Sequence, residues 1–374
     1  MIIAVMPDIQ RALGISSGRA GLLTTALSTP TALFLPVAGV LSDRYGRKTV
    51  MVPGVILYGL GGAISGLFAV LGRRPYLGII IGRIIQGIGA AGMTLVAMSL
   101  AADMFQGEDR IRVLGILEAS NSAGKLVSPL IGTLALTWAW YGPFWVYPIL
   151  SAVVALALII GIDGPHVSGA QGSMGVYGQQ LCLAIQENTI ALVGTYLLAL
   201  ITIVLWFGGL FVSSQRLDHA RVFGTTRGML LAVPVLVLIA TDLWATRCGK
   251  EAWFPKFIGI GLVGMAVGQW GIGHTGNPYL VILALCFSAL AMGLVMPVLN
   301  SIITTTVAEG QRGAVTTTYG SLRSLGSALG PPLFGTLCEG FGSWPFIGAA
   351  SLAIVAAVGG YLWLRRSDGD VFKA

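Results

Sequence analysis

The chain reads Gly39-Val40-Leu41-Ser42-Asp43-Arg44-Tyr45-Gly46-Arg47-Lys48 at the junction of two apolar segments, Ala20–Leu41 and Thr49–Leu71. A helix that crosses a bilayer needs about 20 predominantly apolar residues, so each segment is long enough to span a membrane. Gly46 can turn the chain tightly, because glycine tolerates backbone angles that other residues avoid. The stretch therefore predicts a helix, a charged turn and a second helix.

The same kind of apolar segment recurs throughout the chain. Of its 374 residues, 55% are apolar and only 10% are charged, which leaves too little polar surface for a water-soluble protein. We therefore expect an all-α membrane protein. Eleven segments satisfy the length criterion: Ala20–Leu41, Thr49–Leu71, Tyr76–Ala102, Ile111–Thr137, Pro143–Ile162, Ile190–Val212, Gly228–Ala245, Trp253–Ile272, Tyr279–Ile302, Ala314–Leu337 and Trp344–Leu364.

The polar, glycine-containing stretch Asp163–Asn188 reads as a flexible linker between two halves. We expect an N-terminal bundle at 1–162, a linker at 163–189 and a C-terminal bundle at 190–374. The string Ser128–Leu134 recurs 203 residues later as Pro331–Leu337, as in duplicated transporter folds, although chance similarity is an alternative. With Met1–Met6 taken as the end of a truncated first helix, two pseudo-symmetric six-helix bundles with about eleven complete spans are predicted.

Lysine and arginine residues predict the orientation. If the turn at Ser42–Lys48 is cytoplasmic, the inside segments hold twelve of these residues and the outside segments hold seven. The positive-inside rule then places the linker and the C-terminus in the cytoplasm. The same rule accounts for the net charge of +7, so nucleic acid is not expected as a partner.

The stretch Gly39–Lys48 resembles the signature loop between the second and third helices of the major facilitator superfamily. The resemblance implies a lock that joins the two halves on the cytoplasmic side, in which an Asp43–Arg47 pair reaches Asp103. A plain positively charged turn is the alternative. The residues assigned to this lock are Gly39, Asp43, Arg44, Gly46, Arg47, Lys48 and Asp103.

The stretch Gly82–Ala91 resembles a second motif of the same family, in its fourth helix. An arginine inside an apolar segment is costly and is retained mainly where it faces a cavity or a partner. The resemblance links Arg83 to proton coupling. Alternatively, Arg83 extends to the outer surface beside Arg73 and Arg74.

The segment Ile111–Thr137 contains a turn, Ser120–Ser122, that is unusually polar for a span in lipid. Glu118 and Lys125 are seven residues apart, or two helical turns, so they project from one face toward one cavity together with Asn121. A carboxyl group there can alternate between protonated and ionised states and so couple proton flow to cargo. A static Glu118–Lys125 ion pair is the alternative.

The stretch Gly124–Gly132 resembles the antiporter motif of the family's fifth helix, in which Gly124, Pro129 and Gly132 provide the kink and close packing. Ser128 and Thr133 depart from the glycines of that motif. In the second half, the buried position of Arg323 suggests a partner such as Glu118, with a structural role as the alternative.

These features are similar to those of bacterial twelve-span drug:proton antiporters. We expect a secondary transporter in the cell membrane, not an enzyme, that exports small amphipathic compounds in exchange for protons. Uptake or facilitated transport of a metabolite, or an inactive truncated transporter, are the alternatives. No nucleotide-binding loop, cofactor or metal site is predicted, and we expect a monomer whose partners are protons, the small-molecule substrate and the bilayer.

Overall fold

The computed structural model describes residues 1–104, 107–161, 174–248 and 251–366. The regular elements within these ranges are all helical. They are α1 Ile2–Leu13, α2 Ser17–Tyr45, α3 Arg47–Leu71, α4 Pro75–Met104, α5 Gly107–Ala135, α6 Gly142–Gly161, α7 Met174–Glu187, α8 Thr189–His219, α9 Gly224–Cys248, α10 Phe254–His274, α11 Pro278–Thr305, α12 Glu309–Phe341 and α13 Trp344–Arg366, with a 3-10 turn at Glu251–Trp253.

The long helices coincide with the eleven predicted apolar segments, so the all-α membrane fold is confirmed. In the described ranges, nine helices are long and apolar enough to cross a membrane. The long helices α5 and α12 are not among these nine, because charged and polar residues interrupt their apolar sequence. Such residues are costly in lipid, which favours positions for α5 and α12 inside the bundle.

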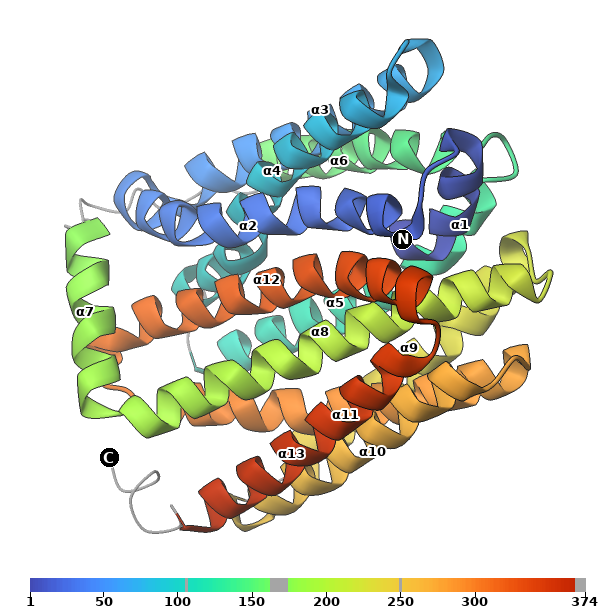
Figure 1. Ribbon diagram of the computed structural model, residues 1–374. Helices are drawn as coiled ribbons and strands as arrows, with labels where there is room; N and C mark the ends of the chain where they lie inside the picture. The colour runs from blue at the N-terminus through green and yellow to red at the C-terminus, as the bar shows by residue number, and fades with distance from the viewer. Residues whose placement is uncertain (105–106, 162–173, 249–250, 367–374) are drawn as a thin grey trace.

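The helices form two groups that lie side by side (Figure 1). Helices α1–α6 form the N-half, and helices α8–α13 form the C-half. Helix α2 of the N-half packs along α12 of the C-half, and α5 packs against α9, so each half contacts the other through two pairs of long helices. The chain passes from one half to the other at the end of the bundle where α7 lies.

Helix α7 occupies most of the segment that was expected to be a flexible linker. Residues 162–173 lie outside the described ranges, whereas Met174–Glu187 forms a helix that packs on α12 and α8. Its apolar residues Leu181, Ala184 and Ile185 are spaced three or four apart, so they share one face that contacts the hydrophobic core. This face anchors the linker to the C-half.

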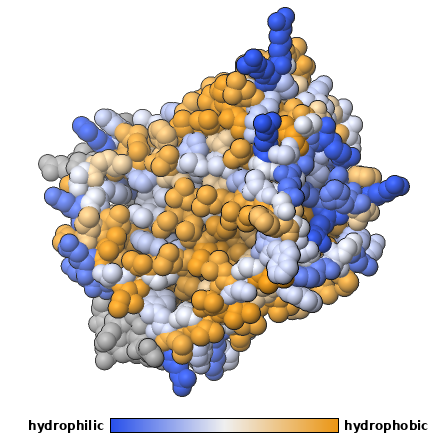
Figure 2. Space-filling model, in the orientation of Figure 1, coloured by the Kyte–Doolittle hydropathy of each residue, from blue (hydrophilic) through white to orange (hydrophobic). Residues whose placement is uncertain are grey.

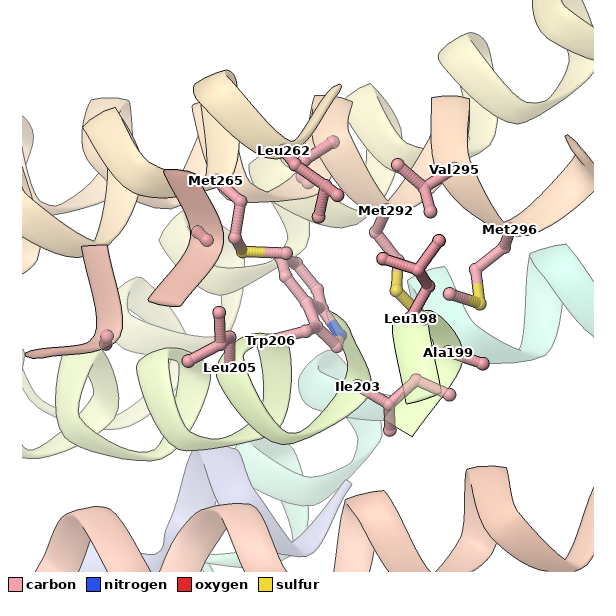
Figure 3. Close-up of a cluster of buried hydrophobic side chains, with 14 of the residues drawn as sticks. Leu198, Ala199, Ile203, Leu205, Trp206, Leu262, Met265, Met292, Val295 and Met296 are labelled. Carbon is pink, nitrogen blue, oxygen red and sulfur yellow. The ribbon is translucent and has the colours of Figure 1, made fainter. Parts of the chain in front are cut away.

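The C-half has a continuous apolar core (Figure 3). Trp206 of α8 lies between Met265 of α10 and Met292 of α11, and all three side chains are buried. Large apolar side chains on the outside remain exposed, as Ile160 does at 75%. Apolar residues also cover the middle of the face in Figure 2, and hydrophilic residues gather at its right edge. This distribution is that of a protein whose solvent is lipid.

Candidate functional site

The two halves are in close contact at one end of the bundle. We call the end that holds residues 43–48 the loop end and the opposite end the far end. At the far end, Gly21 of α2 lies against α12, where an added Cβ atom would be 2.6 Å from Pro332 Cα and 2.7 Å from Pro331 C. The backbone N–H of Ser17 also donates a hydrogen bond to Glu339 of α12. The halves are therefore in direct contact at this end.

The repeated sequence strings make equivalent contacts at the far end. Gly21 of the N-half packs against Pro331 and Pro332 of α12. In the same way, Gly228 of α9 in the C-half packs against Pro129 and Thr133 of α5. A Cβ atom at Gly228 would be 3.1 Å from the Pro129 carbonyl oxygen. The repeat thus marks two pseudo-symmetric helix pairs that hold the halves together.

Toward the loop end, the space along α5 opens. A Cβ atom added at Gly115 or Gly124 would have no described atom within 4 Å. A Cβ atom added at Gly132, nearer the far end, would contact Met1 and Val5 of α1. Across the α2–α12 pair, the nearest atom to a Cβ at Gly39 is Thr317 Oγ1, at 3.8 Å. The helices of the two halves therefore approach each other more closely at the far end than at the loop end.

Charged residues of both halves converge along this looser part of the interface. The carboxyl of Asp242 in α9 is influenced electrostatically by Glu118 and Lys125 of α5 and by Arg323 of α12. Glu118, Asp242 and Arg323 are partly buried, and Lys125 and Asn121 are exposed. In the described structure, Glu118 and Lys125 are not joined by an ion pair. We call Glu118, Lys125, Asp242 and Arg323 the central charge cluster.

Arg323 has a nearby aromatic neighbour in its own helix. Its guanidinium lies 5.6 Å from the ring centre of Tyr319, which stacks in turn on Tyr196 of α8. This contact holds the arginine by a cation–π interaction without neutralising its charge. The positive charge of Arg323 thus acts on the carboxyl of Asp242.

Arg83 lies inside the N-half, only 1% exposed, so it does not extend to the surface beside Arg73 and Arg74. Its Nη1 donates to Gln86 Oε1 at 2.9 Å, and its guanidinium lies 5.2 Å from the Tyr147 ring centre. The described residues offer no hydrogen-bond partner to its Nε and Nη2 atoms. The contacts of Arg83 are thus with α4 and α6, and the central charge cluster lies on other helices.

The signature loop is held by one ion pair and by hydrogen bonds. Gly46 has φ +96°, a backbone conformation that favours glycine, and it separates α2 from α3. Arg47 Nη1 forms an ion pair with Asp43 and donates to Ser42 Oγ at 2.7 Å. Lys48 Nζ donates to the Ile159 carbonyl at the end of α6, where a cation is favourable. The loop thus joins α2, α3 and α6.

Two other predicted lock residues are Arg44 and Asp103. Arg44 is exposed, and its guanidinium lies 5.4 Å from the Tyr45 ring centre. The side chain of Asp103 lies outside the described part of the structure. Within the described residues, Asp43 contacts Arg47 and helix α7.

Tyr177 of α7 binds the signature loop, a contact that sequence reasoning missed. Its hydroxyl donates to Asp43 Oδ2 at 3.0 Å, and it also lies beside Gly39 and Gly313. Burial, and then the charge and hydrogen bond of Asp43, raise the pKa of Tyr177 to about 12. The phenol therefore stays protonated at neutral pH and remains a donor. A tyrosine in a glycine-containing linker gives no sequence signal for this contact.

Replacing Tyr177 by phenylalanine removes only this hydrogen bond. We expect it to weaken the loop-end contact by about 1 kcal/mol, or roughly fivefold in the equilibrium that it stabilises. Transport should change by a few-fold, less than in an Asp43→Asn variant, in an efflux assay at equal expression. An equal loss in both variants would show that Tyr177 does more than bind Asp43.

Asp242 was also missed as a member of the site. An ionisable residue between the apolar residues of a span is a signal of function in itself, and this signal could have identified it. In the described residues, no group of three histidine, cysteine, aspartate or glutamate side chains is placed to hold a metal ion.

Two packed helical halves with ionisable groups at their interface are the arrangement of a membrane transporter. The chain belongs to the Major Facilitator Superfamily, whose family pattern matches residues 1–246 and 232–371. It is 30% identical over 361 residues to the bacillibactin exporter of Bacillus subtilis, covering 95% of this chain and 90% of that protein. It is 23% identical over 381 residues to multidrug resistance protein 2 of the same organism, covering 98% and 92%.

Solved structures share the fold at lower identity. The inward-open xylose transporter XylE from E. coli superposes with a TM-score of 0.73 at 16% identity, covering 96% of this chain and 92% of that one. An inward-facing bacterial homologue of the lysosomal transporter Spinster gives 0.71 at 17% identity, covering 99% and 92%. These structures establish the fold alone.

Proposed function

We propose that this chain exports small amphipathic molecules across the cell membrane by alternating access, in exchange for protons. The observation that carries the proposal is the central charge cluster, which lies where α5 of the N-half packs on α9 of the C-half and where residues of both halves act on the partly buried carboxyl of Asp242. In this proposal the loop end, the linker and the C-terminus face the cytoplasm, and the chain acts as a monomer. The names of two similar proteins, an exporter and a multidrug resistance protein, support the direction of transport.

The charge of the cluster explains why protons and a cationic substrate would exchange. With every group ionised, the carboxylates of Glu118 and Asp242 balance the cations of Lys125 and Arg323. Adding a proton leaves a net positive charge, which disfavours a cation, and binding a cation likewise disfavours the proton. The two ligands therefore compete for the same carboxylates, and competition at one site is the basis of antiport.

Anionic compounds are a second substrate class, which the cations of the cluster favour. Lys125 is exposed and Arg323 keeps its charge, so both can pair with substrate oxygens. Protonation of Glu118 would then help binding instead of opposing it. The effect of pH on binding therefore has opposite signs for the two classes.

The function can be tested in a bacterial strain that lacks its own drug exporters. Cells that produce the chain are loaded with ethidium, an amphipathic cation, or with bacillibactin, and release is followed over time. We expect faster ethidium release than in cells with an empty vector, and loss of that difference when a protonophore collapses the gradient. Release of bacillibactin alone would favour the anionic class, and release of neither would contradict export of these compounds.

An Asp43→Asn variant tests the loop-end lock. The substitution keeps the size of the side chain but removes the charge that binds Arg47. We expect transport to fall by roughly tenfold, the effect of losing a charged hydrogen bond, while the amount of protein in the membrane stays normal. Unchanged ethidium release at equal expression would exclude the lock.

A further inference from the structure

Arg227 is a fully buried arginine at the far end of the bundle, near the start of α9. Its Nη1 atom donates to Asp218 Oδ1 of α8 at 2.7 Å, and its Nη2 atom forms an ion pair with Asp8 of α1. Asp218 and Arg227 both belong to the C-half, whereas Asp8 belongs to the N-half. One buried cation is thus shared by a carboxylate from each side of the interface.

Arg11 forms a second, more exposed bridge over the same carboxylates. Its Nη2 atom lies 2.7 Å from Asp8 Oδ1 and 2.8 Å from Asp218 Oδ1. The Arg11 side chain is 54% exposed, so solvent screens these pairs and their contribution to closure is small. The buried pair between Asp8 and Arg227 is therefore the stronger ionic contact across this part of the interface.

Asp218, the second carboxylate beside Arg227, lowers the free-energy cost of opening the far end. Removing the partner of a buried charge is strongly unfavourable, because the charge is left uncompensated in a medium of low polarity. When the halves separate at the far end, Asp8 moves away with the N-half. Asp218 stays beside Arg227 because α8 and α9 are in the same half. The guanidinium therefore keeps one partner throughout the cycle.

We propose that Arg227 is the gate residue of the far end and that its two carboxylates have opposite effects on the gate. The Asp8–Arg227 pair stabilises the closed far end, and the Asp218–Arg227 pair supports Arg227 when the far end is open. The proposal rests on the alternating access of the proposed function, but it depends on neither the substrate nor the coupling ion.

The test measures the opening of the far end directly. Nitroxide labels are attached at Arg74→Cys and Gly276→Cys, exposed far-end positions in the N-half and the C-half, after the native cysteines are replaced by serine. A second labelled pair, Ile160→Cys and Thr304→Cys, reports on the loop end. Distance distributions are recorded by pulsed electron paramagnetic resonance on the full chain in lipid nanodiscs without substrate.

Asp8→Asn should raise the ratio of open to closed far ends by about tenfold, the effect of losing a charged hydrogen bond, and shorten the loop-end distance. Asp8→Glu, which restores the carboxylate, should recover closure. Asp218→Asn should leave the far end closed. Arg227 still pairs with Asp8 in the closed state, but it has no carboxylate partner when the far end opens, so the open state is destabilised. Arg73→Gln, which neutralises an exposed far-end cation outside this cluster, is the matched control.

The proposal is overturned if Asp8→Asn leaves the far-end distances unchanged or if Asp218→Asn opens the far end as much as Asp8→Asn does. Each variant keeps one carboxylate beside Arg227, so both should fold, and size-exclusion chromatography checks this. Because no substrate is present, the result does not depend on whether the chain exports ethidium. A failure of the gate and a failure of the proposed function are thus distinguishable.

Discussion

Replacing Gly21 by leucine should prevent the far end from closing and should reduce transport strongly. A side chain at this position would overlap the backbone of Pro331 and Pro332, which cannot move aside as a flexible side chain can. Overpacking of this kind costs about 2–3 kcal/mol, which corresponds to roughly a 30- to 150-fold shift of the closing equilibrium. Leucine also favours helix over glycine, so α2 itself should not be weakened.

The matched control for this substitution is Gly359→Leu in α13, where the structure leaves open space around the position of the Cβ atom. We expect normal ethidium release in the control and a loss by more than about tenfold in Gly21→Leu, measured at equal membrane expression. The labelled far-end pair should show long distances in the Gly21 variant only. Normal release together with a closed far end would contradict the packing that we describe.

Replacing Glu118 by glutamine should abolish coupling to the proton gradient. The amide keeps the shape of the side chain but cannot take up a proton, and the central charge cluster retains a net positive charge. Ethidium, which is a cation, should bind more weakly, and gradient-driven release should fall by at least about tenfold, equivalent to 1.4 kcal/mol. The rate of ethidium release is measured across an imposed pH gradient.

Asp109→Asn is the control for the Glu118 variant, since Asp109 is an exposed carboxylate of the same helix at the loop end. Its release rate should respond to the gradient as in the unaltered chain. If Glu118→Gln still exchanges protons for ethidium at the normal ratio, Glu118 is not the proton carrier. Asp242 would then be the carboxylate of the cluster to test next.

The arrangement of spans was predictable because lipid imposes a simple rule on sequence. A helix that crosses a bilayer must be long and mostly apolar, so the eleven long helices are visible as apolar segments. The repeat around Pro129 and Pro331 likewise predicted two related halves. Helix α7 was not predicted, because its short apolar face is set in a glycine-containing linker and is stabilised by packing on α12.

The site was predictable only where its residues are close in sequence. Asp43 and Arg47 are four apart, so their ion pair follows from helical spacing. By contrast, Asp8 and Arg227 are 219 residues apart, so helical spacing gives no sign of their ion pair. Their pairing arises from the contact between the halves, which a single sequence does not specify.

The most direct test of the account is whether the substrate drives protons across the membrane. Everted vesicles that contain the chain are acidified inside by respiration, and the gradient is followed with a pH-sensitive fluorescent amine. Addition of ethidium should release protons from the vesicles that contain the unaltered chain, and not from those that contain Glu118→Gln. Accumulation of ethidium without proton release, or equal proton release with Glu118→Gln, would contradict proton exchange at the central charge cluster.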